Sequence, residues 1–316
     1  MTAAQNNTKG ILFILIGMIV FSIQDALIKF IYEDTALYEL YLGRTLSAAF
    51  FLFCYMKFTK QKVNFKTHYP LLTTIRIICF FFGFSFFYIS LTYMSLAMAN
   101  ALFFSSPFFV SILAVIFLNE KVGIRRWLAI SAGFIGVFIV LNPNFNEFDY
   151  KKLAPIACAL CYSISMTITK YTSDKDNSYT QMMHLYFGAT IISILFFIFT
   201  GDGQFNTSSD PTFQFIFREW FINPTYAWPI IILMGFIGAL AFFCVFNAYS
   251  IASPSVVSLY EYSLIIWSII IGYILFDNIP TLRTFVGVSI IIGAGVYIYL
   301  REKVKDQMIV TDTPNR

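Results

Sequence analysis

Long apolar runs follow one another along almost the whole chain, separated by short polar segments. A helix needs about 20 apolar residues to cross the hydrocarbon core of a bilayer. The first run is too long for the core of a signal peptide, so it is interpreted as a retained span. We predict ten membrane-spanning helices, at 11–31, 38–57, 71–92, 96–118, 124–142, 153–171, 180–200, 227–249, 254–276 and 281–300.

The connections between these runs are mostly short, so neighbouring helices are expected to run antiparallel. The exception is the segment 201–226, where Phe213, Phe217, Trp220 and Phe221 recur at helical spacing. Such a pattern is typical of a short helix that lies in the membrane interface.

Composition supports a membrane protein. The chain is 58% hydrophobic and 12% charged, whereas a soluble domain has about 25% charged residues. Most Lys and Arg residues fall on one side of the predicted spans, which places both termini in the cytoplasm. The net charge of +4 is not gathered into a basic patch with exposed aromatics, so nucleic acid is excluded as a partner.

Two halves of the sequence repeat each other in order. Residues 21–29 match 162–170, and residues 41–45 match 186–190. The segment 95–97 likewise matches 250–252. An odd number of spans per half inverts the second copy, and inverted repeats recur among transporters. We therefore predict an all-α integral membrane fold of two inverted five-helix repeats, over 10–142 and 153–300, followed by a cytoplasmic tail at 301–316.

Several stretches resemble a known family. The segments Leu96–Pro107 and Leu118–Trp127 in the first half, and Leu259–Trp267 and Gly272–Pro280 in the second, are similar to the EamA-type half of the drug/metabolite transporter superfamily. The resemblance covers roughly residues 10–300. It implies a multi-pass transporter of the bacterial inner membrane, and its motifs look most like members that move S-adenosylmethionine or riboflavin.

Charged residues inside a span are costly and suggest function. Asp25 and Arg44 fall in the predicted outer half of the membrane, and their repeat equivalents are Met166 and Ala189, so symmetry does not require them. One interpretation is a structural ion pair of Asp25 with Arg44 or with Lys29. The other is a charged wall of the solute cavity, in which Arg44 binds a carboxylate or phosphate.

Glu261 is the strongest single site candidate. It lies two turns into the ninth predicted span, without a charged neighbour in sequence. Its repeat equivalent is Ser106, beside Pro107, which removes a backbone hydrogen bond and kinks a helix. We expect Ser106 and Glu261 to face one another across the pseudo-two-fold axis. Glu261 then either couples a proton or binds a cation, or it is a protonated carboxyl that holds helices together.

Further polar and aromatic residues in the spans are candidates for the solute site. Each also has a structural interpretation, such as snorkelling of Arg76, an interfacial position of His184, or plain packing of the rings. They are Asn100, Asn247, Tyr88, Tyr260, Tyr262, Trp267, Arg76 and His184.

We predict a secondary transporter that moves a small polar or amphiphilic metabolite, such as an amino-acid derivative, by alternating access. Alternatives are an exporter of amino acids or drugs and an integral membrane lipid-modifying enzyme. The chain is not expected to be an enzyme, to hold a cofactor or to bind a metal. Expected partners are membrane lipids and a small solute, with a coupling proton and a homodimer as further hypotheses.

Overall fold

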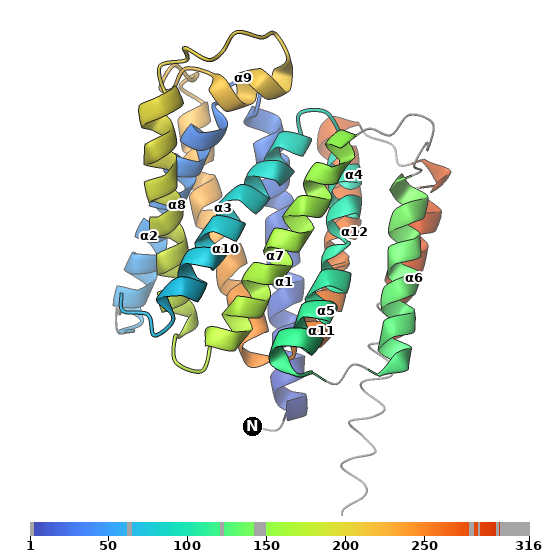
Figure 1. Ribbon diagram of the computed structural model, residues 1–316. Coiled ribbons are helices and arrows are strands. Elements are labelled where there is room, and N and C mark those ends of the chain that lie inside the picture. Colours follow the sequence, from blue (N-terminus) through green and yellow to red (C-terminus); the bar gives the residue numbers. More distant parts are fainter. Residues whose placement is uncertain are drawn as a thin grey trace, which may run out of the picture.

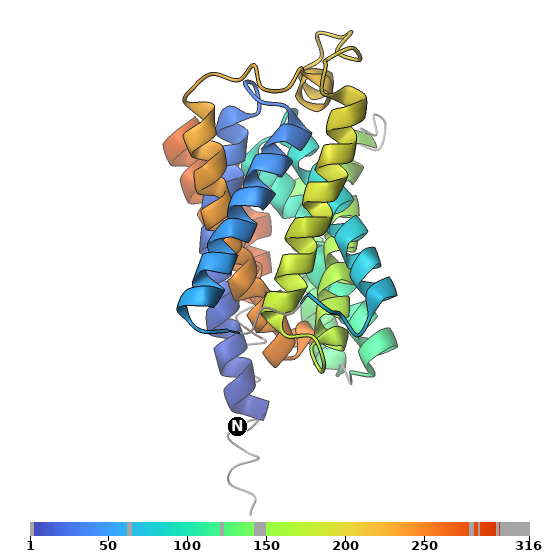
Figure 2. The same cartoon turned by 90° about the vertical axis from the view of Figure 1, so that its left-hand side faces the viewer.

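The computed structural model describes residues 3–61, 65–120, 123–141, 150–277, 281–283, 285–294 and 297. Over these residues the chain forms helices and turns, and no strand. The helices stand side by side in one bundle (Figure 1, Figure 2). In chain order they are α1 (Ala3–Ile31), α2 (Leu37–Phe58), α3 (Pro70–Ser90), α4 (Leu96–Phe103), α5 (Ser106–Leu118), α6 (Ile124–Leu141), η1 (Tyr150–Lys152), α7 (Leu153–Thr172), α8 (Ser178–Thr200), α9 (Pro211–Phe217), α10 (Ala227–Ile251), α11 (Pro254–Tyr260) and α12 (Ser263–Phe276).

The all-helical membrane prediction is confirmed in its coarse form. Seven helical stretches among the described residues are long and apolar enough to cross a membrane, and they match the predicted spans 1, 3, 4, 6, 7, 8 and 9. The helix α2, which carries Glu39 and Arg44, is not among them. The predicted spans 5 and 10 appear as shorter apolar stretches at Trp127–Gly136 and Phe285–Ala294. The count of ten spans stays a prediction.

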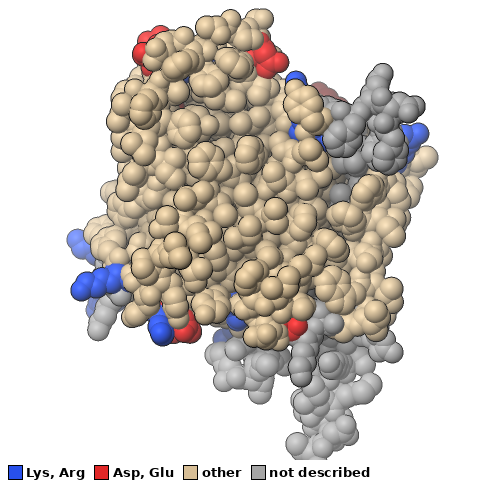
Figure 3. Space-filling model, in the orientation of Figure 1, with Lys and Arg blue, Asp and Glu red and all other residues tan. Residues whose placement is uncertain are grey.

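The outer surface of the bundle suits a lipid environment. Large apolar side chains such as Phe50, Ile198 and Ile232 are exposed along the helices. On the face drawn in Figure 3, charged side chains lie at the two ends and the middle carries none. An apolar band between two charged ends is the arrangement that a bilayer requires.

The fourth and ninth predicted spans are each broken in the middle. The fourth consists of α4 and α5, which are separated by Phe104 and Ser105, and the ninth consists of α11 and α12. Pro107 lies in the first turn of α5, as its missing N–H favours. The break in the ninth span was not predicted, because no proline marks it. Broken helices are common at transporter binding sites, where they bring backbone ends into the bundle.

The predicted bounds of most helices agree with the structure to within a few residues. The first helix is the exception, because it begins at Ala3 and not at residue 11. Hydrophobicity marks the part of a helix that crosses lipid, so it leaves out polar residues that extend the same helix. The helices α5 and α12 both end on a left-handed residue, Asn119 at φ 53° and Asp277 at φ 51°, which is a usual C-terminal cap.

The contacts between helices repeat when the two halves of the chain are exchanged. The helix α1 packs on α10 and α12, and its counterpart α7 packs on α3 and α5. In the same way α4 contacts α12 and α7, whereas α11 contacts α5 and α1. The N-terminus of α1 lies at the lower end of the bundle in Figure 1, and α7 begins at the upper end. The second copy is therefore inverted, as the sequence repeats indicated.

Individual residue contacts also recur in equivalent form when the two halves of the chain are exchanged. Gly43 of α2 faces Ile231 of α10, and a methyl group added to this glycine would lie 2.4 Å from Ile231 Cγ2. Gly188 of α8 faces Ile77 of α3, with a corresponding distance of 2.5 Å. The equivalent residues Thr45 and Thr190 contact each other, with their hydroxyl oxygens 2.9 Å apart. The pseudo-two-fold axis passes between these two threonines.

The segment 201–226 closes one end of the bundle. It contains the predicted interfacial helix, α9, which contacts α2 and α3. The helix ends at Phe217, before the last two residues of the predicted pattern. Trp220 is buried, and Glu39 Oε1 accepts a hydrogen bond of 3.1 Å from the Phe221 N–H. These tertiary contacts hold Phe221 in a left-handed conformation that a helix cannot contain.

Candidate functional site

The two helix breaks bring Glu261 and Ser106 together, as the repeat predicted. Glu261 is fully buried and caps the C-terminus of α11. Its carboxylate accepts hydrogen bonds from Tyr162 at 2.6 Å, Tyr249 at 2.5 Å and Ser106 at 3.4 Å. The Ser106 carbonyl in turn accepts a hydrogen bond of 3.1 Å from Ser163. The carboxylate is thus enclosed by hydroxyl groups from α5, α7 and α10.

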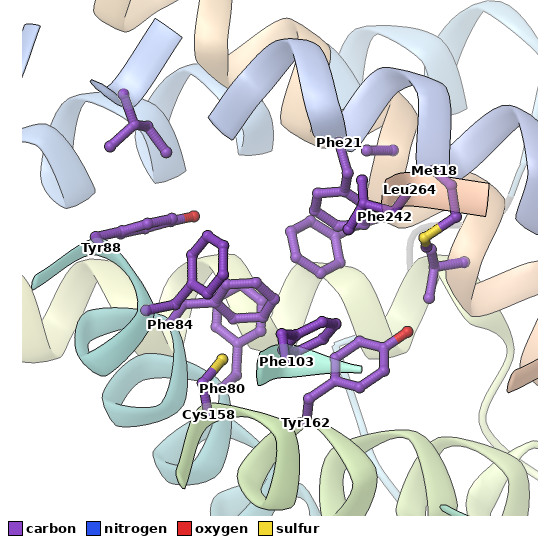
Figure 4. Packing of buried hydrophobic residues seen from close by; sticks show 14 of the residues in the cluster. Met18, Phe21, Phe80, Phe84, Tyr88, Phe103, Cys158, Tyr162, Phe242 and Leu264 are labelled. Carbon is purple, nitrogen blue, oxygen red and sulfur yellow. The ribbon is translucent and has the colours of Figure 1, made fainter. Parts of the chain in front are cut away.

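A small cavity of about 20 Å³ lies close to this carboxylate. Tyr162 belongs to both, because its ring lines the cavity and its hydroxyl reaches Glu261. Figure 4 shows rings from α1, α3 and α4 pointing toward one another around this space. The cavity is lined by Met18, Phe21, Asp25, Phe84, Phe87, Asn100, Phe103, Tyr162 and Leu264.

Two polar side chains face this mostly aromatic cavity. Asp25 of α1 is buried, and Asn100 of α4 lies near its carboxylate. Asn100 also donates a hydrogen bond of 2.8 Å to Ser268 of α12. Asn100 therefore connects the cavity to the second half of the chain.

Arg44 lies close to Asp25 without forming an ion pair with it. Its guanidinium donates a hydrogen bond to the Tyr88 hydroxyl and lies 5.1 Å from the ring centroid of Tyr41 and 5.3 Å from that of Tyr88. Over the part of the chain that the structure describes, the only ion pair within 4.0 Å joins His68 and Asp176. The hypothesis that Asp25 forms an ion pair with Arg44 or Lys29 is therefore not supported by the structure.

Lys29 and Lys170 bind to backbone instead. Lys29 donates hydrogen bonds of 3.0 Å to the carbonyls of Leu91 and Met94, just after α3. Lys170 donates one of 3.0 Å to the Ser250 carbonyl, near the end of α10. Each lysine thus satisfies carbonyls at the C-terminal end of the third helix of its own repeat. The equivalence of these two residues agrees with a structural role.

The remaining predicted site residues are not part of the cavity lining, although Tyr88 contacts Arg44. Arg76 is fully buried on α3, and His184 on α8 contacts the Phe65 carbonyl at 2.8 Å. Asn247 donates a hydrogen bond of 2.7 Å to the Phe243 carbonyl of its own helix. The Tyr262 hydroxyl packs on Gly133 of α6, while Tyr260 and Trp267 are half-buried.

Sequence reasoning missed most of the aromatic lining. Phe21, Phe84, Phe87 and Phe103 were not separated from the 38 phenylalanines of the chain. A usable signal does exist on α3, where Phe80, Phe84 and Tyr88 recur every four residues and so share one helix face. That face points into the bundle, whereas Phe82 and Phe86 of the same helix are exposed.

Corresponding tyrosine–aspartate contacts lie at the two ends of the bundle. Tyr69, which precedes α3, donates hydrogen bonds of 3.0 and 3.1 Å to the carboxylate of Asp174. Tyr226, which precedes α10, donates to Asp34. Desolvation and the contact with Asp174 raise the pKa of Tyr69, and the hydrogen bond to Asp34 with desolvation raises that of Tyr226. Both contacts join one half of the chain to the other.

One of these ends carries an additional polar cluster. Asp176, in the turn between α7 and α8, is paired with His68 Nδ1 at 2.9 Å and accepts a hydrogen bond from Thr67. Burial disfavours ionisation of Asp176, but the hydrogen bonds from Thr67 and His68 outweigh it, so its pKa is lowered. The cluster ties the segment before α3 to the turn before α8.

Among the described residues, no three His, Cys, Asp or Glu side chains lie close enough together to hold a metal ion. Cys158 and Cys161, which form a CxxC motif, are free thiols on α7, where Cys158 is buried. Both cysteines pack within the bundle, in agreement with a packing role.

Comparison with known proteins agrees with this architecture. Over 301 residues, covering 95% of this chain and 96% of the relative, the chain is 25% identical to the S-adenosylmethionine uptake transporter of Rickettsia prowazekii (strain Madrid E). It is 27% identical over 198 residues to the riboflavin transporter of Vibrio cholerae serotype O1 (strain ATCC 39315 / El Tor Inaba N16961), covering 63% of this chain and 60% of that protein.

A solved crystal structure shares the fold, with a TM-score of 0.67 at 12% sequence identity, over 95% of this chain and 98% of that chain. The model of the EamA-like transporter family matches residues 8–142 and 152–300 of this chain. With its apolar helices and bacterial relatives, the chain is a multi-pass protein of the bacterial inner membrane that transports a small metabolite. It belongs to the EamA-like transporter family.

Proposed function

We propose that this chain transports a small metabolite that carries a cationic centre next to a flat ring system, together with a carboxylate. The observation that carries the proposal is the position of Asp25. This buried carboxylate faces an aromatic cavity and has no cationic side chain within ion-pair distance among the described residues. A buried carboxylate without a protein cation is a ready partner for a cationic ligand.

The rest of the cavity wall supports the same class of solute. Phe21, Phe84 and Phe103 offer ring faces, which attract cations and stack on flat groups. Arg44 adds a guanidinium near Tyr88 that can bind a carboxylate. The related proteins are named for S-adenosylmethionine and riboflavin, which both contain flat heterocycles. A sulfonium-bearing amino acid such as S-adenosylmethionine matches Asp25, the rings and Arg44 together.

Transport on this proposal proceeds by alternating access in a ten-span protein with both termini in the cytoplasm. The helices α1–α6 form one half and α7–α12 the other, and their contacts repeat in inverted form. This arrangement supports a rocking motion of the two halves about the pseudo-two-fold axis. Lys57, Lys60, Lys66 and Lys175 lie at the end where α2 ends and α3 begins, whereas Lys151, Lys152 and Arg218 lie at the opposite end. This charge distribution supports a cytoplasmic end at the start of α3.

Glu261 is the proposed site of a coupling proton. It is buried, and three hydroxyl groups hold its carboxylate beside the cavity. Tyr162 gives the proton site a direct connection to the solute, because the same residue contacts both. Protonation of Glu261 would change the hydrogen bonds of Tyr162 and thereby the wall of the cavity.

A homodimer stays a prediction. Small residues on α6, which are typical of close helix contacts, pack inside the chain: Gly133 lies against Tyr262, and Gly136 lies against Gly287 and Ile291. These residues are therefore used for packing within one chain. The relatives are named as transporters, and the proposal includes no enzymatic activity.

Uptake by purified full-length protein in proteoliposomes tests the proposal. We expect saturable uptake of radiolabelled S-adenosylmethionine, and Asp25→Asn should raise its KM by about tenfold or more, the effect of losing about 1.4 kcal/mol of binding free energy. Met166→Leu, at the position equivalent to Asp25, is the matched control and should keep the wild-type KM. Absence of uptake by the wild type, or an unchanged KM in correctly inserted Asp25→Asn, would contradict it.

A further inference from the structure

Arg76 has an unusual combination of burial and missing partners. The side chain is fully buried on α3, six residues after the helix begins. Its Nη1 donates to Gln181 and, at 3.5 Å, to Thr172. Its Nε and Nη2 have no hydrogen-bond acceptor among the described residues. An arginine carries five N–H donors, so most of this guanidinium is without a partner in a place where water is scarce.

The unpartnered edge is the one that binds anions. The N–H groups of Nε and Nη2 point in parallel, which is the geometry for a bidentate carboxylate or phosphate. The other edge is fixed, because Gln181 is itself held by the Asp176 carbonyl at 2.8 Å. The ring of Phe246 lies 5.8 Å from the guanidinium and supports its orientation. The Nε and Nη2 donors of Arg76 are therefore fixed in orientation but have no acceptor among the described residues.

No acidic side chain is available to fill that edge. Asp176 is the carboxylate that acts on Arg76 electrostatically, but its oxygens already accept from Thr67 and His68. No carboxylate lies within 4.0 Å of Arg76 in the described part of the chain. If Arg76 were held for stability alone, a closer carboxylate partner would be expected.

Arg76 also lies on the face of α3 that leads to the cavity. Arg76, Phe80, Phe84 and Tyr88 recur every four residues on this face. Figure 4 shows Phe80, Phe84 and Tyr88 along α3. Phe84 lines the cavity, and the Tyr88 hydroxyl accepts a hydrogen bond from Arg44. The ring of Phe242 on α10 packs on two of these rings, with centroid distances of 4.9 Å to Phe80 and 5.8 Å to Phe84. An aromatic path thus joins the guanidinium groups of Arg76 and Arg44.

We propose that Arg76 is a second anion-binding station, which receives the carboxylate of the transported solute when the cytoplasmic end opens. In the closed arrangement the segment before α3 and the turn before α8 cover it, through Thr67, His68 and Asp176. Separation of these segments exposes the Nε and Nη2 edge. Arg44 holds the carboxylate on the outer side, and Arg76 holds it on the inner side. The inference rests on the proposed function, since it assigns the solute a carboxylate.

Membrane vesicles of known sidedness test this station with two probes. The probes are S-adenosylmethionine and its decarboxylated analogue, which differ only in the carboxylate. In inside-out vesicles, the wild type should have a KM about tenfold lower for S-adenosylmethionine, and Arg76→Lys should abolish this preference, because lysine cannot bind bidentately. In right-side-out vesicles the variant should keep the wild-type preference. An unchanged preference in inside-out vesicles would overturn the station.

A second measurement is independent of the identity of the solute. A membrane-impermeant arginine reagent is applied to both kinds of vesicle, and the modified peptides are identified by mass spectrometry. Arg76 should be modified only in inside-out vesicles, and Arg44, as the matched control in the same chain, only in right-side-out vesicles. An Arg76 that resists modification from the cytoplasmic face is structural, and the station is then wrong. If neither probe is transported but Arg76 is modified as expected, the proposed solute fails and the station stands.

Discussion

The two ends of the bundle share a plan but differ in what is added to it. At one end Tyr226 binds Asp34, and at the other Tyr69 binds Asp174, so a tyrosine of one half contacts an aspartate of the other half at both ends. Only the Tyr69 end adds the His68–Asp176 pair and the buried Arg76. The shared contacts follow from the inverted repeat, whereas the additions distinguish the proposed cytoplasmic end from the proposed outer end.

The same distinction applies at the middle of the bundle. Thr45 and Thr190 are equivalent and contact each other on the axis. Glu261 also meets its equivalent, but that residue is Ser106, so a carboxylate faces a hydroxyl. Asp25 is equivalent to Met166. Symmetric residues hold the two halves together, and residues that break the symmetry carry the charges from which we derive transport.

The largest expected effect comes from removing the asymmetric charge at the axis. Glu261→Gln keeps the size and hydrogen-bonding capacity of the side chain but cannot release a proton. We expect accumulation of solute driven by a pH gradient to fall by about 100-fold, because the loss of a buried hydrogen-bonded charge costs about 3 kcal/mol or more. Uptake into proteoliposomes with and without an imposed gradient measures it.

Tyr162→Phe supplies the intermediate case for this experiment. It removes one of the hydrogen bonds to Glu261 while leaving the ring in the cavity wall. A smaller loss, of about tenfold, is expected for one such bond to a charged group. Gradient-driven accumulation at the wild-type level in Glu261→Gln would rule out Glu261 as the proton site and leave the fold unaffected.

The next effect is on stability, and it concerns the equivalent helix contacts made by Gly43 and Gly188. Gly43→Val and Gly188→Val place a side chain against Ile231 and Ile77, where even a first carbon atom would be too close. We expect each to destabilise the protein by a similar amount, about 1–3 kcal/mol for overpacking. Thermal unfolding in detergent measures both variants.

Compensating changes sharpen this test. Ile231→Ala should restore the stability of Gly43→Val, and Ile77→Ala that of Gly188→Val, whereas the exchanged combinations should not. Strongly unequal losses for the two glycines would show that the contacts are not equivalent in energy, although they are equivalent in position.

The sequence predicted the frame better than the site, for a physical reason. Apolar runs located the spans, and the match of residues 21–29 to 162–170 placed Lys29 and Lys170 in equivalent roles, which their carbonyl contacts confirm. The repeat likewise placed Ser106 opposite Glu261. These inferences need only periodicity and order along the chain.

The site depends on distances across the bundle, which no local pattern contains. One of the two interpretations paired Asp25 with Arg44 or with Lys29, but that lysine binds the carbonyls after α3, and Arg44 donates to Tyr88. The break in the ninth span lacks the proline that revealed the break beside Pro107. The carbonyls of Leu91 and Met94 compete with Asp25 for Lys29, and this competition can be recognised only once α3 has been placed beside α1.

A smaller effect should separate the two ends from each other. Tyr69→Phe removes the contact with Asp174 and should favour opening at the cytoplasmic end, whereas Tyr226→Phe removes the contact with Asp34 and should favour opening at the outer end. Each change should shift the ratio of the inner to the outer KM by about twofold, in opposite directions, as the loss of one modest hydrogen bond implies. Right-side-out and inside-out vesicles give the two values. Shifts in the same direction would break the proposed correspondence between the ends.

The smallest effect is a pH dependence that belongs to one end alone. The pKa of Asp176 is lowered in the folded protein from its ordinary value of 3.8, so its ionised form adds stability above that value. This stability is lost as the pH falls through the lowered pKa and the pair with His68 is released.

Between pH 6 and 4, Asp176→Asn should melt about 2 °C below the wild type, which corresponds to less than about 1 kcal/mol in a protein of this size. Well below the lowered pKa of Asp176 the two melting temperatures should converge. Asp202→Asn, in the exposed segment at the other end, is the control and should track the wild type at every pH. A difference between Asp176→Asn and the wild type that persists in acid would mean that the asparagine disturbs packing and that ionisation of Asp176 does not stabilise the cytoplasmic end.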